Sequence, residues 1–466
     1  MLSVLRQGPG FYRHLFALSL PIVLQNLIST SLGFVDTFMV GLLGSNELSA
    51  VTAANSLLFL LQIAIFGLTS GLSVLVSQYW GRNDLRAINR AVGVVLYASL
   101  ALIGTAAVVF FFYPESSMAL VTDNPLLIEL GAPYLRIAGV SYVCNALSSV
   151  YVSLERSVEN PTLGTVVFAT SVTMNTLLNY CLIFGKFGAP AWGITGAAVA
   201  TLISRFAEVV IVAVYMLTRR RIPLYPRELL RPGFLMFKDF LRYSVLILFN
   251  EFMWGLGQTM FTTILGHMPT SADMLAAFAV MSNIDKMSTV TCYGLADATA
   301  IILGKRIGQA ADREEIYKLG CCLLLVAVLL GGCISAVLAI LLPTVFRPIL
   351  FPLFHLNEYA ASAVTLMCIA YLLQMPCRSF NNSVITGVLR SGGDVRAAIA
   401  VDLIPLWLIA IPLTAFFALV LKAPIPVICV GIYCENVCKM PLGFLRLRSR
   451  KWINDITHSE TEKKGR

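Results

Sequence analysis

The sequence predicts an all-α polytopic membrane protein with twelve transmembrane helices in two six-helix lobes. Three observations lead to this fold class: an apolar composition, a regular succession of apolar runs, and an internal repeat. Of the 466 residues, 58% are hydrophobic and 13% are charged, whereas a typical soluble chain carries about 25% charged residues. A helix that crosses a bilayer needs roughly 20 apolar residues. The composition therefore places most of the chain in a membrane.

Twelve apolar runs are long enough to span, and turn-forming residues separate them. The first run is expected to be a retained span and not a cleaved signal peptide. The expected spans, with ends uncertain by several residues, are 16–41, 52–78, 90–113, 129–154, 162–185, 194–217, 240–266, 275–303, 317–343, 358–388, 397–421 and 424–445.

The distribution of positive charge predicts the orientation of these spans. With a cytoplasmic N-terminus, the cytoplasmic connections and the tail hold nearly all Lys and Arg outside the spans, including the run 219–221. The opposite connections hold Lys186, Arg347 and Lys422. Cytoplasmic loops of membrane proteins show this excess, so we expect a multi-pass protein of the cell inner (plasma) membrane with both termini cytoplasmic. Topology accounts for the net charge of +9, and nucleic-acid binding is therefore not indicated.

The two halves of the chain are related to each other. The segment GLTSGLSVLVSQYWGRNDLR (67–86) aligns with GLADATAIILGKRIGQAADR (294–313), and LERSVENP (154–161) resembles LRSGGDV (389–395). Because each half holds an even number of spans, both halves insert in the same orientation, which gives the parallel pseudo-two-fold repeat found in many transporters. The expected organisation is an N-lobe at 1–217, a cytoplasmic linker at 218–238, a C-lobe at 239–450 and a cytoplasmic tail at 451–466.

The first span carries a single acid, Asp36, near its outer end. An ionised carboxylate in the bilayer core is costly, so such an acid is a functional hypothesis by default. The alternative is a structural acid bonded to Asn or Tyr. With a rise of about 1.5 Å per residue, Asp36 and four polar residues fall within roughly 8 Å of one another in depth. These four are Tyr134, Asn175, Asn179 and Thr201.

Charged residues also occur at membrane depth in the second half. Glu251 has Phe249, Phe252 and Trp254 as sequence neighbours, and an acid among aromatic rings suits an organic cation. The alternative for Glu251 is an ion pair with Lys286, which lies within about four residues of it in depth.

Asp297, Arg378 and Asp402 share an inner depth, where we expect a C-lobe charge cluster that acts as a structural or gating ion pair. Four further charged residues are expected near the cytoplasmic interface, where long side chains reach water. They are Glu155, Arg205, Glu208 and Glu435.

Several segments taken together resemble a known family. The first span contains LPIVLQN and FVDTFMVG, the fifth and sixth contain NYCLIFG and WGITGAAVAT, and the second half contains VITGVLRSGGD. This combination resembles the bacterial type of the multidrug and toxic compound extrusion (MATE) family over nearly the whole chain. The resemblance implies a secondary active antiporter that exports cationic or amphipathic drugs by alternating access, driven by H⁺ or Na⁺ and without an organic cofactor. We expect a monomer in the lipid bilayer.

The resemblance also implies roles for individual residues. Asp36 matches the acid of the family's N-lobe cation site, with Na⁺ as its candidate metal, and Asn175, Asn179, Tyr134 and Thr201 match flanking polar positions. Asn179 stands where many members have aspartate, which leaves this site one carboxylate. Glu251 matches an acid of span seven in other members, which implies binding of substrate or a second cation, with Lys286 near it. Asn381 and Asn382 stand in the region where those members have an acid in span ten.

Two other classes are alternatives. A flippase for lipid-linked oligosaccharides, from the same superfamily, would favour several cations at membrane depth, where the sequence has Arg136, Lys286 and Arg378. A membrane-embedded acyltransferase would need a histidine in a paired acid motif near an interface. None of the four histidines lies in such a motif, and no GxxxxGK[ST] pattern indicates direct drive by ATP. We therefore expect a transporter and not an enzyme.

Overall fold

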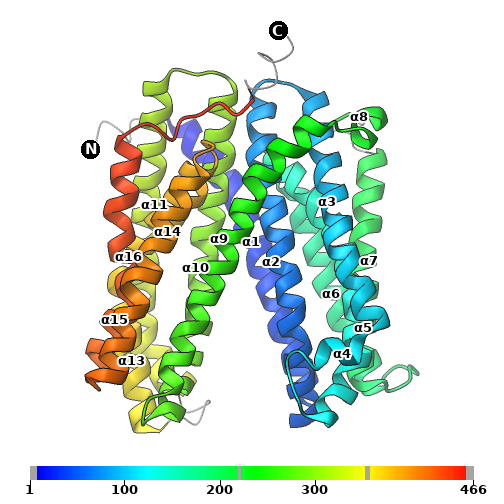
Figure 1. The fold of residues 1–466 in the computed structure, drawn as a ribbon, viewed down its shortest axis with the longest axis vertical. Coiled ribbons are helices and arrows are strands. Elements are labelled where there is room, and N and C mark those ends of the chain that lie inside the picture. Colours follow the sequence, from blue (N-terminus) through cyan, green and yellow to red (C-terminus); the bar gives the residue numbers. More distant parts are fainter. Residues whose placement is uncertain (1–7, 219–221, 224, 352–356, 458–466) are drawn as a thin grey trace. The chain divides into compact units, whose positions relative to one another are not determined.

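The computed structural model describes residues 8–218, 222–223, 225–351 and 357–457 (Figure 1). Parts of the linker expected at 218–238 and of the tail expected at 451–466 lie outside these residues. The helices of the first half are α1 (Pro9–Gly41), α2 (Ser45–Gly81), α3 (Leu85–Phe112), α4 (Pro114–Met118), α5 (Pro125–Ser157), α6 (Thr162–Phe184), α7 (Gly193–Thr218) and α8 (Pro226–Leu230). Those of the second half are α9 (Phe234–Gly266), α10 (Ser271–Gly308), α11 (Arg313–Leu341), α13 (Glu358–Asn382), α14 (Val395–Pro405), α15 (Ile411–Ala415) and α16 (Ile425–Arg448).

Four segments of the second half are π-helical and continue the α-helices next to them. Proline has no N–H for the usual backbone bond, and such interruptions favour a wider turn. Pro343 and Pro348 lie within the first π-helical segment, and Pro405 directly precedes the third. The segments are η1 (Leu342–Leu350), η2 (Ser383–Arg390), η3 (Leu406–Ala410) and η4 (Phe416–Val420).

The helix content confirms the predicted all-α polytopic fold. Among the described residues, 11 helical runs are long and apolar enough to cross a membrane. Three of these runs combine α- and π-helical parts: Arg313–Ile349, Glu358–Arg390 and Val395–Val420. The remaining predicted span corresponds to α9, whose 33 residues carry charged side chains in the first turns and Glu251 further along.

The chain packs as two compact units, each with its own hydrophobic core. One unit is Leu20–Leu248, in which α5 packs against α2, α3 and α7, and α6 packs against α7. The other unit comprises Met1–Ser19 and Phe249–Arg466, in which α13 packs against α10, α11 and α16. The unit boundaries fall inside α1 and α9, whereas the sequence places the lobe boundary in the linker. The expected lobe limits stay a prediction.

The two halves of the internal repeat have matching helix ends. The aligned residues Gly81 and Gly308 end α2 and α10, and the following helices begin after Asp84 and Asp312. Both aspartates cap their helices: Asp84 accepts from the Ala87 amide at 2.9 Å, and Asp312 accepts from the Glu314 amide at 3.0 Å. A side-chain oxygen at this position satisfies an otherwise unpaired helical N–H. The sequence similarity between the halves thus reflects one helix–turn–helix geometry used twice.

The first residues of the tail are part of the folded unit. Trp452 is fully buried, and its indole N–H donates to the Leu447 carbonyl at 3.2 Å. The Asn454 amide donates to the Gly392 carbonyl at 3.1 Å. A Cβ atom at Gly392 would lie 2.0 Å from the Trp452 carbonyl oxygen, and Gly393 has a φ of 73°. Glycine is required at Gly392 by the close approach and favoured at Gly393 by the left-handed backbone.

Candidate functional site

Asp36 ends a chain of hydrogen bonds that links α1, α6 and α7. Its carboxylate accepts from the Asn179 side-chain amide at 2.5 Å. The same amide donates to the Asn175 side-chain oxygen at 3.0 Å, and Asn175 donates to the Thr201 hydroxyl at 3.2 Å. Asn179 and Asn175 are 0% and 1% exposed. Four of the five residues expected at the N-lobe site therefore lie in one continuous polar chain.

The sequence around Gln25 explains why α1 presents Asp36 to α6. The Gln25 amide donates to the Pro161 carbonyl at 2.5 Å and to the Thr165 hydroxyl at 3.2 Å. Gly164 permits this approach, because a Cβ atom there would lie 2.6 Å from the Gln25 side-chain oxygen. Asp36 lies about three helical turns after Gln25 and so on the same face of α1. Gln25 and Asp36 thus bond to the beginning and the end of the same helix.

The fifth expected residue, Tyr134, has another hydrogen-bond partner. Its hydroxyl donates to the Asn55 side chain on α2 at 3.2 Å. Tyr134 is 8% exposed and lies within electrostatic range of Asp36. The structure therefore places Tyr134 beside the polar chain but not in it.

The expectation that Glu155 and Glu208 reach water is wrong, and Arg205 is only partly exposed. Arg205 is in the middle of α7 and forms an ion pair with Glu208 at 2.8 Å, with side chains 17% and 0% exposed. Ser148 on α5 donates to the same glutamate at 2.8 Å. Glu155 is fully buried and accepts from Asn160 at 2.6 Å. These charges are buried because partners within the unit compensate them.

Glu251 forms an ion pair with Arg390, which the sequence places in a loop. The two side chains meet at 2.6 Å and are 21% and 4% exposed. Arg390 is the last residue of η2, so the helical run that begins with α13 carries it to this depth. The alternative of an ion pair with Lys286 is therefore wrong, and Lys286 is exposed.

The aromatic neighbours of Glu251 do not enclose it. Phe249 and Phe252 are 52% and 43% exposed, and Trp254 packs against the hydrophobic core of its unit. Phe252, which directly follows Glu251 on α9, points in a different direction, whereas Trp254 at i+3 lies on the same side of the helix. Binding of an organic cation at Glu251 stays a prediction.

Arg390 is expected to stabilise the unit by compensating Glu251. Arg390→Met should lower the free energy of unfolding by about 3 kcal/mol, because it leaves a largely buried carboxylate unpaired. The double variant Arg390→Met with Glu251→Gln should lose less than the sum of the single losses. The melting temperature in detergent measures both. The control is Lys286→Met, which should change stability by no more than about 0.5 kcal/mol; an equal loss there would show that Lys286 shares the pairing.

In the cluster expected from Asp297, Arg378 and Asp402, Arg378 and Asp402 have different ion-pair partners. Asp402 pairs with Lys439 at 2.8 Å and accepts from Asn250 at 2.8 Å. Arg378 pairs instead with Asp285 at 2.9 Å. Asp297 is a half-buried residue of α10. The expectation that Arg378 and Asp402 pair is wrong because equal depth does not fix the direction in which a helical side chain points.

Glu435, expected near the interface, is also buried. It lies 3.6 Å from Lys439, which it shares with Asp402, and both side chains are at most 6% exposed. Among the described residues, its second oxygen has no hydrogen-bond partner. With Asp285 and Arg378, Glu435 lines a cavity of about 40 Å³, which is large enough for a water molecule.

Sequence reasoning missed several residues that complete these networks, four of which are charged or bind a residue of the expected sites. Asn55, Asp285, Lys439 and Arg390 are each the partner of a residue that it had singled out. The i,i+4 spacing of Glu435 and Lys439 was a usable signal, because such pairs face each other on a helix. Asp285 directly precedes Lys286, so their shared depth could not show which of the two points inward.

The sequence matches the MatE family over residues 21–181 and 247–416. It is 26% identical over 453 residues to the "Uncharacterized transporter YisQ" of Bacillus subtilis, covering 94% of each chain. It is 24% identical over 416 residues to the "Probable multidrug resistance protein NorM" of Photorhabdus laumondii, covering 87% of this chain and 88% of that protein.

A solved structure has the same fold. It is described as the outward-facing conformation of a multidrug resistance MATE family transporter of the MOP superfamily. The match has a TM-score of 0.84 at 18% identity and covers 96% of this chain and 97% of that one. At this identity the likeness shows the fold, and the sequence matches show the family. The chain therefore belongs to the MatE family of transporters.

Proposed function

We propose that this transporter exports cationic or amphipathic drugs by alternating access, coupled to entry of H⁺ or Na⁺ at Asp36. The observation that carries the proposal is the hydrogen-bonded chain from Asp36 through Asn179 and Asn175 to Thr201. It joins an acid on α1 to buried amides on α6, and a buried amide bound to a carboxylate responds to the charge of that carboxylate.

Protonation of Asp36 would change this contact directly. An ionised carboxylate only accepts hydrogen bonds, whereas a protonated one also donates. The Asn179 side-chain oxygen has no hydrogen-bond partner among the described residues. It is therefore available to accept a hydrogen bond from the protonated carboxyl group of Asp36. A change in the charge of Asp36 therefore rearranges the bond between α1 and α6.

Helix α1 is well placed to convert this change into movement. Of its most apolar stretch, 29% is buried within the protein, similar to the 28% in α3 and α6 and below the 61% in α2 and α5. A helix with few buried contacts opens or shifts at a lower free-energy cost than one packed on all sides. The bond between Asp36 and Asn179 is thus a substantial part of what holds this half of α1 in place.

The donor atoms suit either coupling ion. Carboxylate, amide and hydroxyl oxygens are the ligands that hard cations prefer, and Asp36, Asn179 and Thr201 supply one of each kind. A proton needs only the carboxylate and an acceptor for its hydrogen bond. We therefore propose H⁺ or Na⁺ as the transported cation, with Asp36 as its binding residue.

The decisive test is dye efflux in proteoliposomes with imposed ion gradients. A cationic dye should move against its gradient when Na⁺, H⁺ or both are supplied on the opposite side, and should stop moving when the gradient is collapsed with an ionophore. Dye movement that depends on neither the Na⁺ nor the H⁺ gradient would contradict ion coupling. Movement of lipid-linked oligosaccharides in place of dye would favour a flippase.

Glu251 is proposed to take part in binding the substrate or a second cation. Because Arg390 already pairs with it, a cationic substrate has to compete with that guanidinium. Glu251→Gln should raise the KM for a permanently charged dye by about tenfold and leave the KM for a neutral amphipath within about twofold. The same reconstituted efflux assay measures both. Equal changes for the two dyes would remove Glu251 from substrate recognition.

A further inference from the structure

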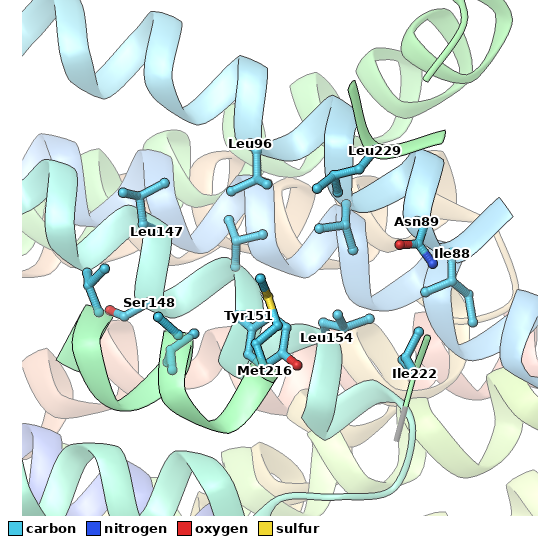
Figure 2. A pocket seen from close by; sticks show the side chains of 15 residues that line it. Ile88, Asn89, Leu96, Leu147, Ser148, Tyr151, Leu154, Met216, Ile222 and Leu229 are labelled. Carbon is cyan, nitrogen blue, oxygen red and sulfur yellow. The ribbon is translucent and has the colours of Figure 1, made fainter. Parts of the chain in front are cut away.

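A cavity of about 220 Å³ lies in the Leu20–Leu248 unit, away from the chain of polar residues at Asp36. Figure 2 shows its lining side chains converging from several helices. They come from the beginning of α3, the ends of α5 and α7, and the segment that follows α7. The lining residues are Ile88, Asn89, Val92, Leu96, Leu147, Ser148, Val150, Tyr151, Leu154, Val209, Val212, Ala213, Met216, Ile222 and Leu229.

The polar groups in this lining are already engaged. Asn89 donates to the carbonyls of Leu85 and Pro223 and accepts from the Tyr225 amide. Ser148 donates to Glu208, and the Tyr151 hydroxyl bonds to Glu155. A ligand inside the cavity therefore meets hydrocarbon. A cavity of about 150 Å³ with such a lining holds a benzene-sized apolar group, so this cavity suits part of an acyl chain.

Several residues that line the cavity within the candidate membrane spans are partly exposed. Leu96, Leu147 and Met216 are half-buried, and Ala213 is exposed. All four lie within the spans of α3, α5 and α7. A chain that enters here can do so from the hydrocarbon of the bilayer without crossing water.

Positive charge gathers where the beginning of α3 and α8 line the cavity. Arg86 and Arg90 flank the lining residues Ile88 and Asn89, and Arg227 lies near Leu229. These arginines surround one acid, Glu228 on α8. The hydrogen bond from Arg90 lowers the pKa of Glu228, and the charges of Arg86 and Arg227 act in the same direction. The cluster of these four residues, here called the arginine rim, keeps a net positive charge beside an apolar cavity.

The described part of the segment after α7, residues 222–223 and 225–230, is held against α3 beside the cavity. Glu228 pairs with Arg90 at 2.6 Å, and the Leu230 carbonyl accepts from Tyr97 at 3.1 Å. A Cβ atom at Gly93 would lie 2.2 Å from the Leu229 carbonyl oxygen. Figure 1 shows α8 beside the beginning of α3. Ile222 and Leu229 from this segment form one wall of the cavity.

We propose that this cavity and the arginine rim together bind one anionic phospholipid. One acyl chain occupies the cavity, and the headgroup phosphate contacts Arg86 and Arg227. Anionic lipids are attracted to arginines at the membrane surface. The lipid also contacts Ile222 and Leu229, so its binding stabilises the clamped position of the segment that follows α7. Drug-like molecules fit less well, because the lining leaves no polar group to orient them.

The test uses full-length protein reconstituted with phosphatidylglycerol that carries a photoreactive group on one acyl chain. The matched probe is phosphatidylcholine with the same chain. After illumination, mass spectrometry of the peptides that line the cavity should show about tenfold more labelling with the anionic lipid. Ala213→Trp fills the opening and should remove most of this labelling. Val214→Trp, at the next residue of α7, which is 53% exposed, should retain it.

Further variants separate the cavity from the rim. Arg86→Gln with Arg227→Gln should abolish the preference for the anionic lipid while labelling of the cavity continues. If Ala213→Trp does not fold, as judged by size-exclusion chromatography, Ala213→Leu gives the same test with a smaller side chain. Unchanged labelling in a folded Ala213 variant, equal labelling by both lipids in the parent protein, or displacement of the lipid by a cationic dye would each overturn the proposal.

Discussion

Asp36→Asn is expected to abolish ion-coupled efflux while leaving the protein folded in the membrane. Asparagine has nearly the same shape and can still accept from Asn179, so the bond between α1 and α6 survives. It carries no charge in either state, so ion binding no longer changes that bond. Gradient-driven dye efflux should fall at least tenfold, which corresponds to about 1.4 kcal/mol of coupling free energy. Proteoliposomes that contain equal amounts of the variant and parent proteins provide the measurement.

Glu129→Gln is the matched control for this experiment. Glu129 is an exposed acid on α5 in the same unit, and its loss removes the same charge without touching the polar chain. It should leave efflux within about twofold of the parent rate. Retained coupling in Asp36→Asn, with the variant folded, would remove Asp36 from the mechanism. A parallel loss in Glu129→Gln would attribute the effect to net charge.

Lys439→Met is expected to give the largest loss of stability. Lys439 lies between Asp402 at 2.8 Å and Glu435 at 3.6 Å, and its side chain is 4% exposed. Removing it leaves the buried carboxylates of Asp402 and Glu435 without their ion-pair partner. Breaking a buried ion pair from one side costs about 3–5 kcal/mol, so the melting temperature in detergent should fall well below that of the parent.

Two further variants identify the cause of that loss. Lys318→Met removes an exposed lysine that lies 3.9 Å from Glu314 and should cost at most about 1 kcal/mol, as for surface pairs in general. Asp402→Asn with Glu435→Gln in the Lys439→Met background should recover much of the lost stability, because neither of the two side chains then buries an uncompensated charge. A failure to recover would mean that Lys439 acts through packing of its methylene stem.

The sequence was sufficient to predict the overall architecture. Span length and the positive-inside bias are properties of the bilayer and act on each segment separately, so they can be read without knowing the tertiary contacts. The helix-capping role of Asp84 and Asp312 is also independent of tertiary contacts, because a cap depends on the spacing of neighbouring residues. The combined α- and π-helical run Glu358–Arg390 was not predictable from such local properties. The span expected at 358–388 ended before Arg390.

The candidate sites were predicted less completely, and the reason is geometric. Depth along a helix can be counted in residues, but the direction of a side chain around the helix depends on how the helices pack. Asn175 and Asn179 were placed together because one helix carries both. Lys286 was chosen over Asp285, and Arg378 was expected near Asp402, because nothing in a single sequence gives the rotation of a helix against its neighbours.

The docked tail changes how the RSGGD turn should be regarded. In binding terms, residues 451–457 are a ligand that is tethered to its receptor, and Gly392 and Gly393 form the receptor surface. A tether raises the effective concentration of such a ligand into the millimolar range when it is short, so even a weak contact stays closed. The glycines of this turn are thus constrained by a partner more than fifty positions later in the chain. A fusion tag placed directly after Arg448 would have to displace that ligand, whereas one placed after Thr457 would leave it bound.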